Sequence, residues 1–139
     1  MSVLLDTCVV SELRRNDGNP RVREAVNAIP DDDLFLSVLT IGEIIKGIAL
    51  LESGKKQQAL QEWVRKLQAE FADHILPVDL MTCAIWGEVT AQARGRGVTV
   101  PAVAGLIAAT ARRHGLYLMT RNVADFAATG VPVLNPWQQ

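Results

Sequence analysis

The sequence predicts an α/β fold built on a parallel sheet. Short apolar runs, suited to buried strands, alternate along the chain with longer stretches whose apolar residues recur at helical spacing. This alternation is typical of parallel strands joined by helices. The chain has 139 residues, of which 49% are hydrophobic and 21% charged. We therefore expect one folded domain over residues 1–139, with a substantial core.

Clear boundary signals divide the first half of the chain. Asn19 is placed to cap a helix that begins at Pro20, and Ser37 is placed to cap the next one. The pair Ser53-Gly54 then interrupts the helical pattern. We expect strands at 3–5 and 34–36, and helices at 8–15, 20–29, 38–52 and 55–71.

The second half follows the same pattern. Asp79 is a plausible cap for one helix, and Gly115 is expected to end another as a C-cap. A short helical turn is expected at 124–126, after the segment Thr120-Arg121-Asn122. We expect strands at 75–78, 116–119 and 131–134, and longer helices at 79–94 and 102–115.

Composition and the cysteines narrow the class of protein. The formal net charge of −1 gives no overall basic field, so any nucleic-acid surface must be local. Cys8 and Cys83 form neither a disulfide framework nor a metal-type spacing, so both are expected to be reduced. The start MSVLLDTCVV lacks the basic region of a signal peptide, and no apolar stretch reaches about 20 residues. A cytoplasmic protein without a membrane span is expected.

Polar side chains follow two of the predicted strands where those strands end. Asp6-Thr7 follows the first strand, and Thr120-Arg121-Asn122 follows a later one, with Asp125 one turn beyond. Ligands of parallel α/β sheets bind at the carboxyl ends of the strands. Glu43, the only acid in VLTIGEII, is expected near an apolar surface, where burial would require a partner or a metal.

Several acids at one sheet edge favour a bound divalent cation. Mg²⁺ or Mn²⁺ fits oxygen ligands, and such a site suits hydrolysis of a phosphodiester. The residues alone leave a structural alternative open, in which Asp6 and Asp79 are helix caps, Glu43 is solvated and Asp125 ends a helix. His74 has no expected catalytic role, and His114 is expected to complement a helix dipole.

The chain resembles the PIN-domain family, and more narrowly the VapC/FitB-type toxins of bacterial type II toxin–antitoxin systems. The resemblance runs over residues 3–137 and is carried, in order, by LLDTCVVSEL, SVLTIGEIIKGI, PAVAGLIAATARRHGL, LMTRNVADF and VPVLNPW. It implies a PIN-like three-layer α/β/α fold with a short-stranded, mainly parallel central sheet. It further implies a Mg²⁺- or Mn²⁺-dependent endoribonuclease that acts on RNA. The implied partners are a cognate antitoxin and a second copy of the chain, with a hetero-oligomer on DNA also expected.

The resemblance also assigns residues by position. It implies that Asp6 and Glu43 are catalytic metal ligands, supported by Thr7 and Thr120, and that the catalytic group includes Asn122 and Asp125. The third acid of the family, in the pattern P-x-x-D-x-L-I-A-A-T, corresponds to Ala104. We therefore expect one weakly held metal and reduced or abolished activity. The otherwise intact helix favours deliberate replacement of an aspartate at Ala104 over natural degeneration.

The sequence singles out four further residues near the expected site. Cys8 stands where the family usually has an asparagine, and a thiol is expected to be a poor substitute for an amide that orders the loop. Arg121, Lys46 and Arg14 are the expected RNA contacts. The apolar faces of 38–51 and 60–71 are expected to serve either the core or the antitoxin. The alternative function is a non-catalytic PIN-fold module that binds an antitoxin or RNA.

Overall fold

A computed structural model describes residues 1–138 and confirms the expected parallel α/β architecture. Its five strands form one sheet in the order β3-β2-β1-β4-β5, and every neighbouring pair is parallel. The first strand therefore lies at the centre of the sheet. The strands are β1 (Val3–Leu5), β2 (Leu34–Ser37), β3 (Ile75–Leu76), β4 (Tyr117–Met119) and β5 (Val133–Leu134).

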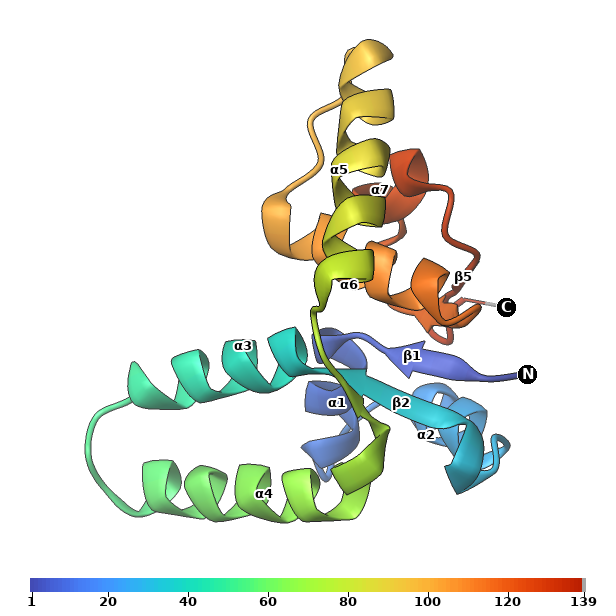
Figure 1. Ribbon diagram of the computed structural model, residues 1–139. Helices are drawn as coiled ribbons and strands as arrows, with labels where there is room; N and C mark the ends of the chain where they lie inside the picture. The colour runs from blue at the N-terminus through green and yellow to red at the C-terminus, as the bar shows by residue number, and fades with distance from the viewer. Residues whose placement is uncertain (139) are drawn as a thin grey trace.

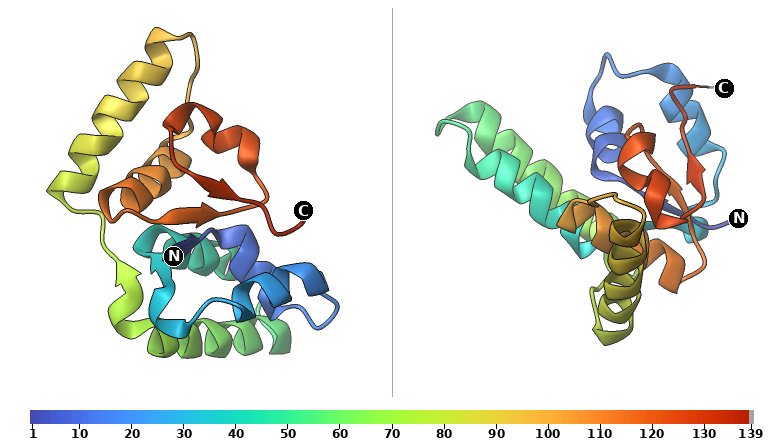
Figure 2. Two further views of the ribbon diagram at one scale, coloured as in Figure 1. Left: turned by 90° about the vertical axis from the view of Figure 1, so that its right-hand side faces the viewer. Right: turned by 90° about the horizontal axis from the view of Figure 1, so that it is seen from above.

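Seven α-helices connect the strands within residues 1–138. Figures 1 and 2 place α1, α2 and α4 on one side of the sheet and α5, α6 and α7 on the other. The helices α3 and α4 run antiparallel and project from the sheet as a hairpin (Figure 1). The bounds are α1 (Thr7–Arg14), α2 (Pro20–Asn27), α3 (Val38–Ala49), α4 (Lys55–Phe71), α5 (Leu80–Gly95), α6 (Ala102–Arg113) and α7 (Val123–Phe126).

None of the helices in the described part of the chain has the length and apolar character of a transmembrane segment. Short 3₁₀ turns precede β2, precede β3 and follow α7, at Asp31–Asp33, Ala72–His74 and Ala127–Thr129.

The expected helix caps are confirmed by hydrogen bonds. The side chain of Asn19 accepts from the Arg21 N–H (2.9 Å), and that of Ser37 accepts from the Leu39 N–H (3.0 Å). Gly115 has φ +66°, the left-handed conformation that favours glycine just after a helix end. The ends of three elements were predicted less well. The helix α3 ends at Ala49, and the strands β3 and β5 are each only 2 residues long.

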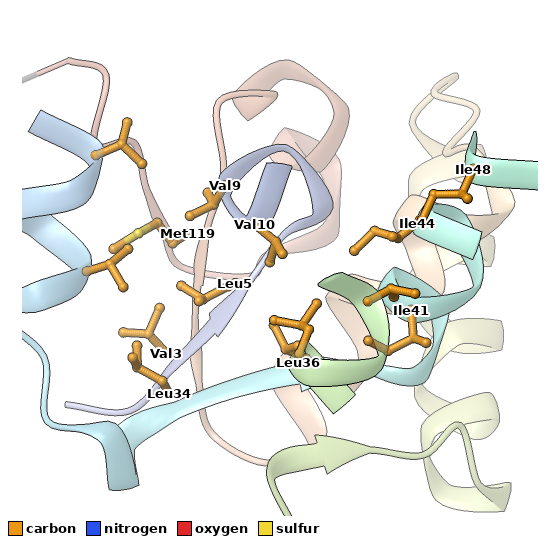
Figure 3. Close-up of a cluster of buried hydrophobic side chains, with 14 residues drawn as sticks. Val3, Leu5, Val9, Val10, Leu34, Leu36, Ile41, Ile44, Ile48 and Met119 are labelled. Atoms are coloured by element: carbon orange, nitrogen blue, oxygen red, sulfur yellow. The ribbon is translucent and has the colours of Figure 1, made fainter. Parts of the chain in front are cut away.

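The side chains of β1 alternate between two cores. Val3 and Leu5 face the cluster formed with α1–α4, whereas Leu4 faces the cluster formed with α6 and α7. Figure 3 shows the first cluster, in which three isoleucines of α3 lie near Leu36: Ile41, Ile44 and Ile48. This alternation, which follows from the two-residue period of a strand, covers the sheet on both faces.

The helices α5 and α6 are joined near the sheet by an ion pair. Asp79 caps α5, because its Oδ1 accepts from the N–H and the hydroxyl of Thr82 (2.9 and 2.8 Å). Arg113 at the end of α6 donates to both oxygens of the same carboxylate at 3.0–3.2 Å. A glycine permits close contact of the two helices, since a Cβ on Gly105 would lie only 3.0 Å from the Trp86 ring.

We predict that Asp79→Asn lowers the thermal stability of the protein at pH 7. The Arg113 guanidinium, followed by the bonds from Thr82, holds the pKa of the Asp79 carboxyl well below its usual 3.8. A depressed pKa stabilises the fold above the unfolded value and loses that effect as pH falls towards the folded value. The difference in melting temperature between the two proteins should therefore shrink as pH falls below about 4. Asp17→Asn, at an exposed ion pair with Arg15, is the control and should change little at either pH.

Candidate functional site at the carboxyl edge of the sheet

The expected polar residues come together where β1 and β4 end. Leu5 pairs with Met119, so the next residues, Asp6 and Thr120, leave the sheet side by side. A pocket of about 230 Å³ lies at this edge. It is lined by Asp6, Thr7, Cys8, Glu43, Pro101, Val103, Ala104, Ile107, Asn122, Asp125 and Phe126.

Asp6 is the most enclosed acid of this pocket, with 6% of its surface exposed. Its Oδ1 accepts from the Thr7 N–H (2.9 Å), and its Oδ2 accepts from the buried Thr120 hydroxyl (2.7 Å). The Thr120 Oγ1 in turn accepts from the Asn122 N–H (3.0 Å). Asp6 is thus both a helix cap, as the structural alternative held, and a pocket carboxylate of fixed orientation.

Glu43 reaches the same pocket from α3, but it is exposed rather than buried. The expected apolar surface is present, because Glu43 also lines an adjoining cavity with Val38 and Leu39. Glu43 is exposed, however, so it carries no burial cost that a partner or a metal would have to offset. Its Oε1 accepts a short hydrogen bond from the Thr7 hydroxyl (2.6 Å), and that hydroxyl lies 3.2 Å from Thr40 Oγ1. Thr7 therefore connects both expected metal ligands, through its N–H to Asp6 and through its hydroxyl to Glu43.

Three further residues complete the wall of the pocket. Asn122 and Asp125 are exposed and flank the start of α7, and the Asp125 N–H donates to the Asn122 carbonyl (3.1 Å). Ala104 lies in the first turn of α6 and presents only a methyl group to the pocket. Pro101, the N-cap residue of α6, makes no side-chain hydrogen bond to the helix, so the first N–H groups of α6 have no such partner.

Cys8 takes part in the hydrogen bonding of this edge through its thiol. Its Sγ accepts from the Arg121 N–H (3.5 Å), lies 3.5 Å from Thr120 Oγ1, and donates to Asp6 Oδ2 (3.7 Å). Polarisable sulfur forms weaker hydrogen bonds than an amide, but here the thiol joins the two strand ends. Burial, with a smaller contribution from the Asp6 charge, raises the pKa of the Cys8 thiol.

The expected RNA contacts lie at different distances from the pocket. Lys46 lines an adjoining cavity of about 450 Å³, which it shares with Glu43. Arg121 is exposed, with its guanidinium 5.4 Å from the centre of the Trp137 ring. Arg14, at the far end of α1, lies over Trp63 and lines a separate cavity.

His74 packs against neighbouring residues of the fold and does not line the acidic pocket. Its ring stacks on Phe35 with centroids 4.5 Å apart, and its Nδ1 lies 2.8 Å from the Leu34 carbonyl oxygen. This arrangement agrees with the absence of an expected catalytic role. The partner of His74 was not evident from the sequence, since residues 35 and 74 meet only through the pairing of β2 with β3.

The donor groups of the pocket are oxygen ligands of the kind that a divalent cation takes. Within residues 1–138, no group of three His, Cys, Asp or Glu side chains is arranged to hold a metal ion. Two linked carboxylates, Asp6 and Glu43, nevertheless line one pocket with the Asn122 amide. Mg²⁺ is commonly bound by one or two carboxylates while it keeps several waters. Ala104 contributes no oxygen, so the pocket lacks the charge for a tighter site.

The fold and the pocket define a class: a small α/β protein whose parallel sheet carries an acidic pocket at its carboxyl edge. Residues 3–131 match the PIN domain, so the chain belongs to the PIN-domain family. It is 39% identical over 136 residues to the toxin FitB of Neisseria gonorrhoeae, covering 97% of this chain and 98% of that protein. It is 33% identical over 140 residues to the VapC ribonuclease Y4jK of Sinorhizobium fredii, covering 98% of each.

Solved structures agree with this assignment. The crystal structure of FitAcB from Neisseria gonorrhoeae contains a chain that matches with a TM-score of 0.93 and 38% identity, covering 99% of each chain. The structure of VapBC2 from Rickettsia felis bound to a promoter DNA fragment shares the fold, with a TM-score of 0.81 at 16% identity and 97% and 98% coverage. The expected three-layer PIN-like fold is confirmed.

We predict that Thr120→Val destabilises the protein by about 1–3 kcal/mol in urea unfolding, because it leaves the enclosed Asp6 Oδ2 short of a strong donor. Valine keeps the shape of threonine, so packing is little changed. The exposed Thr99 provides the control Thr99→Val, which should stay within about 0.5 kcal/mol of the unsubstituted protein. Equal stability of the two variants would contradict the role given to the Thr120 hydroxyl.

We predict that Cys83 reacts with a thiol-specific reagent before Cys8 does. Cys83 is exposed on α5, whereas Cys8 is partly buried with a raised pKa and so has less thiolate near neutral pH. Timed labelling at pH 8 followed by peptide mass mapping would give the order. In urea, where burial is removed, the two rates should converge; faster labelling of Cys8 in the folded protein would refute the prediction.

Proposed function

We propose that this chain is one PIN domain acting as the toxin half of a type II toxin–antitoxin system, an endoribonuclease by descent whose own activity is reduced or abolished at Ala104. The observation that carries the proposal is the edge pocket, in which Asp6 and Glu43 lie opposite an alanine. The full-length similarity to the toxin FitB supports the toxin role, and the similarity to a VapC ribonuclease supports the choice of RNA as substrate.

The residues of the pocket have distinct proposed roles. Asp6 and Glu43 would hold a Mg²⁺ or Mn²⁺ ion, which when bound supplies Lewis acidity to a phosphodiester and acidifies a water molecule. Thr120 and the Thr7 N–H orient Asp6, and the Thr7 hydroxyl orients Glu43. Asn122 offers an amide to the substrate or to ordered water. Asp125, which is exposed at the pocket, would accept a proton from an attacking water.

An alanine in place of an aspartate at position 104 should affect the chemistry of the pocket more than the fold. Alanine has the highest helix propensity, so α6 begins normally. An aspartate at the same position would lie in the first turn of α6, where the helix dipole favours negative charge. Without it, the pocket has less negative charge near Asp6 and Glu43, so cation affinity and cleavage rate should both fall.

The proposed partners are a cognate antitoxin, RNA and a second copy of the chain, in a cytoplasmic protein. FitAB has been solved bound to a DNA fragment, which supports a toxin–antitoxin hetero-oligomer on DNA here as well. The cavity beside Glu43 supports a partner surface, because exposed apolar side chains from α3 and α6 line it: Val38, Leu50 and Val103.

We predict that Ala104→Asp creates or increases RNA cleavage in the presence of Mn²⁺ or Mg²⁺. The gain should be roughly 10- to 100-fold or more, the range associated with loss of partners at metal sites. Cleavage of a labelled RNA would be followed with metal and with chelator. Two controls separate charge at the site from charge on the helix: Ala104→Asn, and Ala102→Asp on an exposed residue outside the pocket lining.

Two results would count against this function. Cleavage by the unsubstituted chain as fast as by the Ala104→Asp variant would show that the alanine does not limit activity. If none of the variants cleaves RNA and none inhibits cell growth, the enzyme proposal fails. Binding of an antitoxin or RNA without cleavage would then favour the alternative, a non-catalytic PIN-fold binding module.

A further inference from the structure

We propose that Arg121 and Trp137 form one binding element for an unpaired RNA nucleotide at the rim of the acidic pocket. Arg121 would contact the phosphate, and the Trp137–Arg121 pair would stack on the base. The inference rests on the proposed function and deepens it, because it adds a residue pair that favours single-stranded over duplex RNA.

Strand register places both side chains at the edge that carries the pocket. Met119 pairs with Leu134, and the Thr120 N–H donates to the Leu134 carbonyl (3.0 Å). The segments that follow β4 and β5 therefore leave the sheet together, on the same side as Asp6. The Arg121 N–H is bonded to Cys8 Sγ, and Asn122 lines the pocket, so the backbone at Arg121 is fixed beside it.

Trp137 is held in place before any ligand binds. Its N–H donates to Asn135 Oδ1 (3.0 Å), its ring packs against the core cluster under α1–α4, and Pro136 beside it is buried. A fixed aromatic ring loses little entropy on binding, and stacking on such rings is a common way to hold unpaired bases.

Within residues 1–138, no carboxylate lies within ion-pair distance of the Arg121 guanidinium. The side-chain ion pairs of this part of the chain join Arg15 to Asp17, Arg65 to Glu62 and Arg113 to Asp79. The guanidinium is instead exposed above the indole ring. Guanidinium groups combine phosphate hydrogen bonding with stacking on planar rings. A cation at this rim also offsets the repulsion that Asp6, Glu43 and Asp125 exert on an RNA backbone.

A second pair in the same chain serves as an internal control. Arg14 lies over Trp63 at 5.8 Å, nearly the same separation as in the Arg121–Trp137 pair. It lines a cavity between α1 and α4 that contains none of the residues of the acidic pocket. The two pairs share their chemistry and differ in location, so Trp63 is the matched control for Trp137.

The experiment measures binding of the full chain to a fluorescein-labelled 12-nucleotide RNA and to the corresponding 12-base-pair duplex, by anisotropy in EDTA so that cleavage cannot interfere. Arg121→Ala and Trp137→Leu should each weaken single-strand binding by roughly 5- to 100-fold, the range for loss of one base-stacking side chain. Arg121→Ala should also reduce the slope of log Kd against log salt by about 1. Trp137→Leu should leave the slope unchanged, and Trp63→Leu, the matched control, should leave both quantities unchanged.

Folding is monitored by thermal unfolding of each variant, and Trp137→Phe keeps an aromatic ring if the leucine variant is unstable. Phenylalanine should restore most of the single-strand affinity, which a purely structural role of Trp137 would not predict. The inference is overturned if Arg121→Ala binds single strands as tightly as the unsubstituted chain. Equal affinity of the unsubstituted chain for single strands and duplex, or no RNA binding at all, would overturn it too.

These outcomes are independent of the test of the proposed function. Cleavage by the Ala104→Asp variant, together with unchanged RNA binding by Arg121→Ala, would remove the inference and leave the function. An inactive Ala104→Asp variant, together with single-strand binding that depends on Arg121 and Trp137, would remove the nuclease function and leave the binding element.

Discussion

The hydrogen bond from the Thr120 hydroxyl to Asp6 Oδ2 joins two strand ends that are 114 residues apart in the chain, and the arrangement of the pocket depends on it. From Asp6 the network continues through Thr7 to Glu43 on α3. From Thr120 it continues to the Asn122 N–H at the start of α7. Residues from three separate segments thus share one set of contacts, so a change at one of them should alter the geometry of the others.

Ala104 lies outside this network, which explains how the pocket keeps its shape without the third acid. Its side chain makes only apolar contacts, next to the cluster formed by α6 and β4. Removing a carboxylate here also removes repulsion against Asp6, and buried or crowded like charges are costly. A substitution at residue 104 can therefore change the chemistry of the site without changing its architecture. A substitution of Thr120 would change both.

Much of the fold followed from local signals in the sequence. Asn19, Ser37 and Gly115 mark helix ends through contacts with their own neighbours, so the sequence reveals them. The gathering of Asp6 with Asn122 also followed, because parallel strands end at a common edge. The exposure of Glu43 and the hydrogen bonds of Cys8 did not follow, since both depend on how distant segments pack.

The central position of the first strand has a consequence for synthesis of the protein. Val3 pairs with Leu34 on one side and with Tyr117 on the other, so β1 remains half-paired until nearly the whole chain exists. A nascent chain that has not yet emerged from the ribosome as far as Asn122 lacks one wall of the pocket and the donor that orients Asp6. Contacts of such long sequence separation also form slowly. A protein with this topology completes its acidic pocket only after the segment that follows β4 has been synthesised and has joined the sheet beside β1.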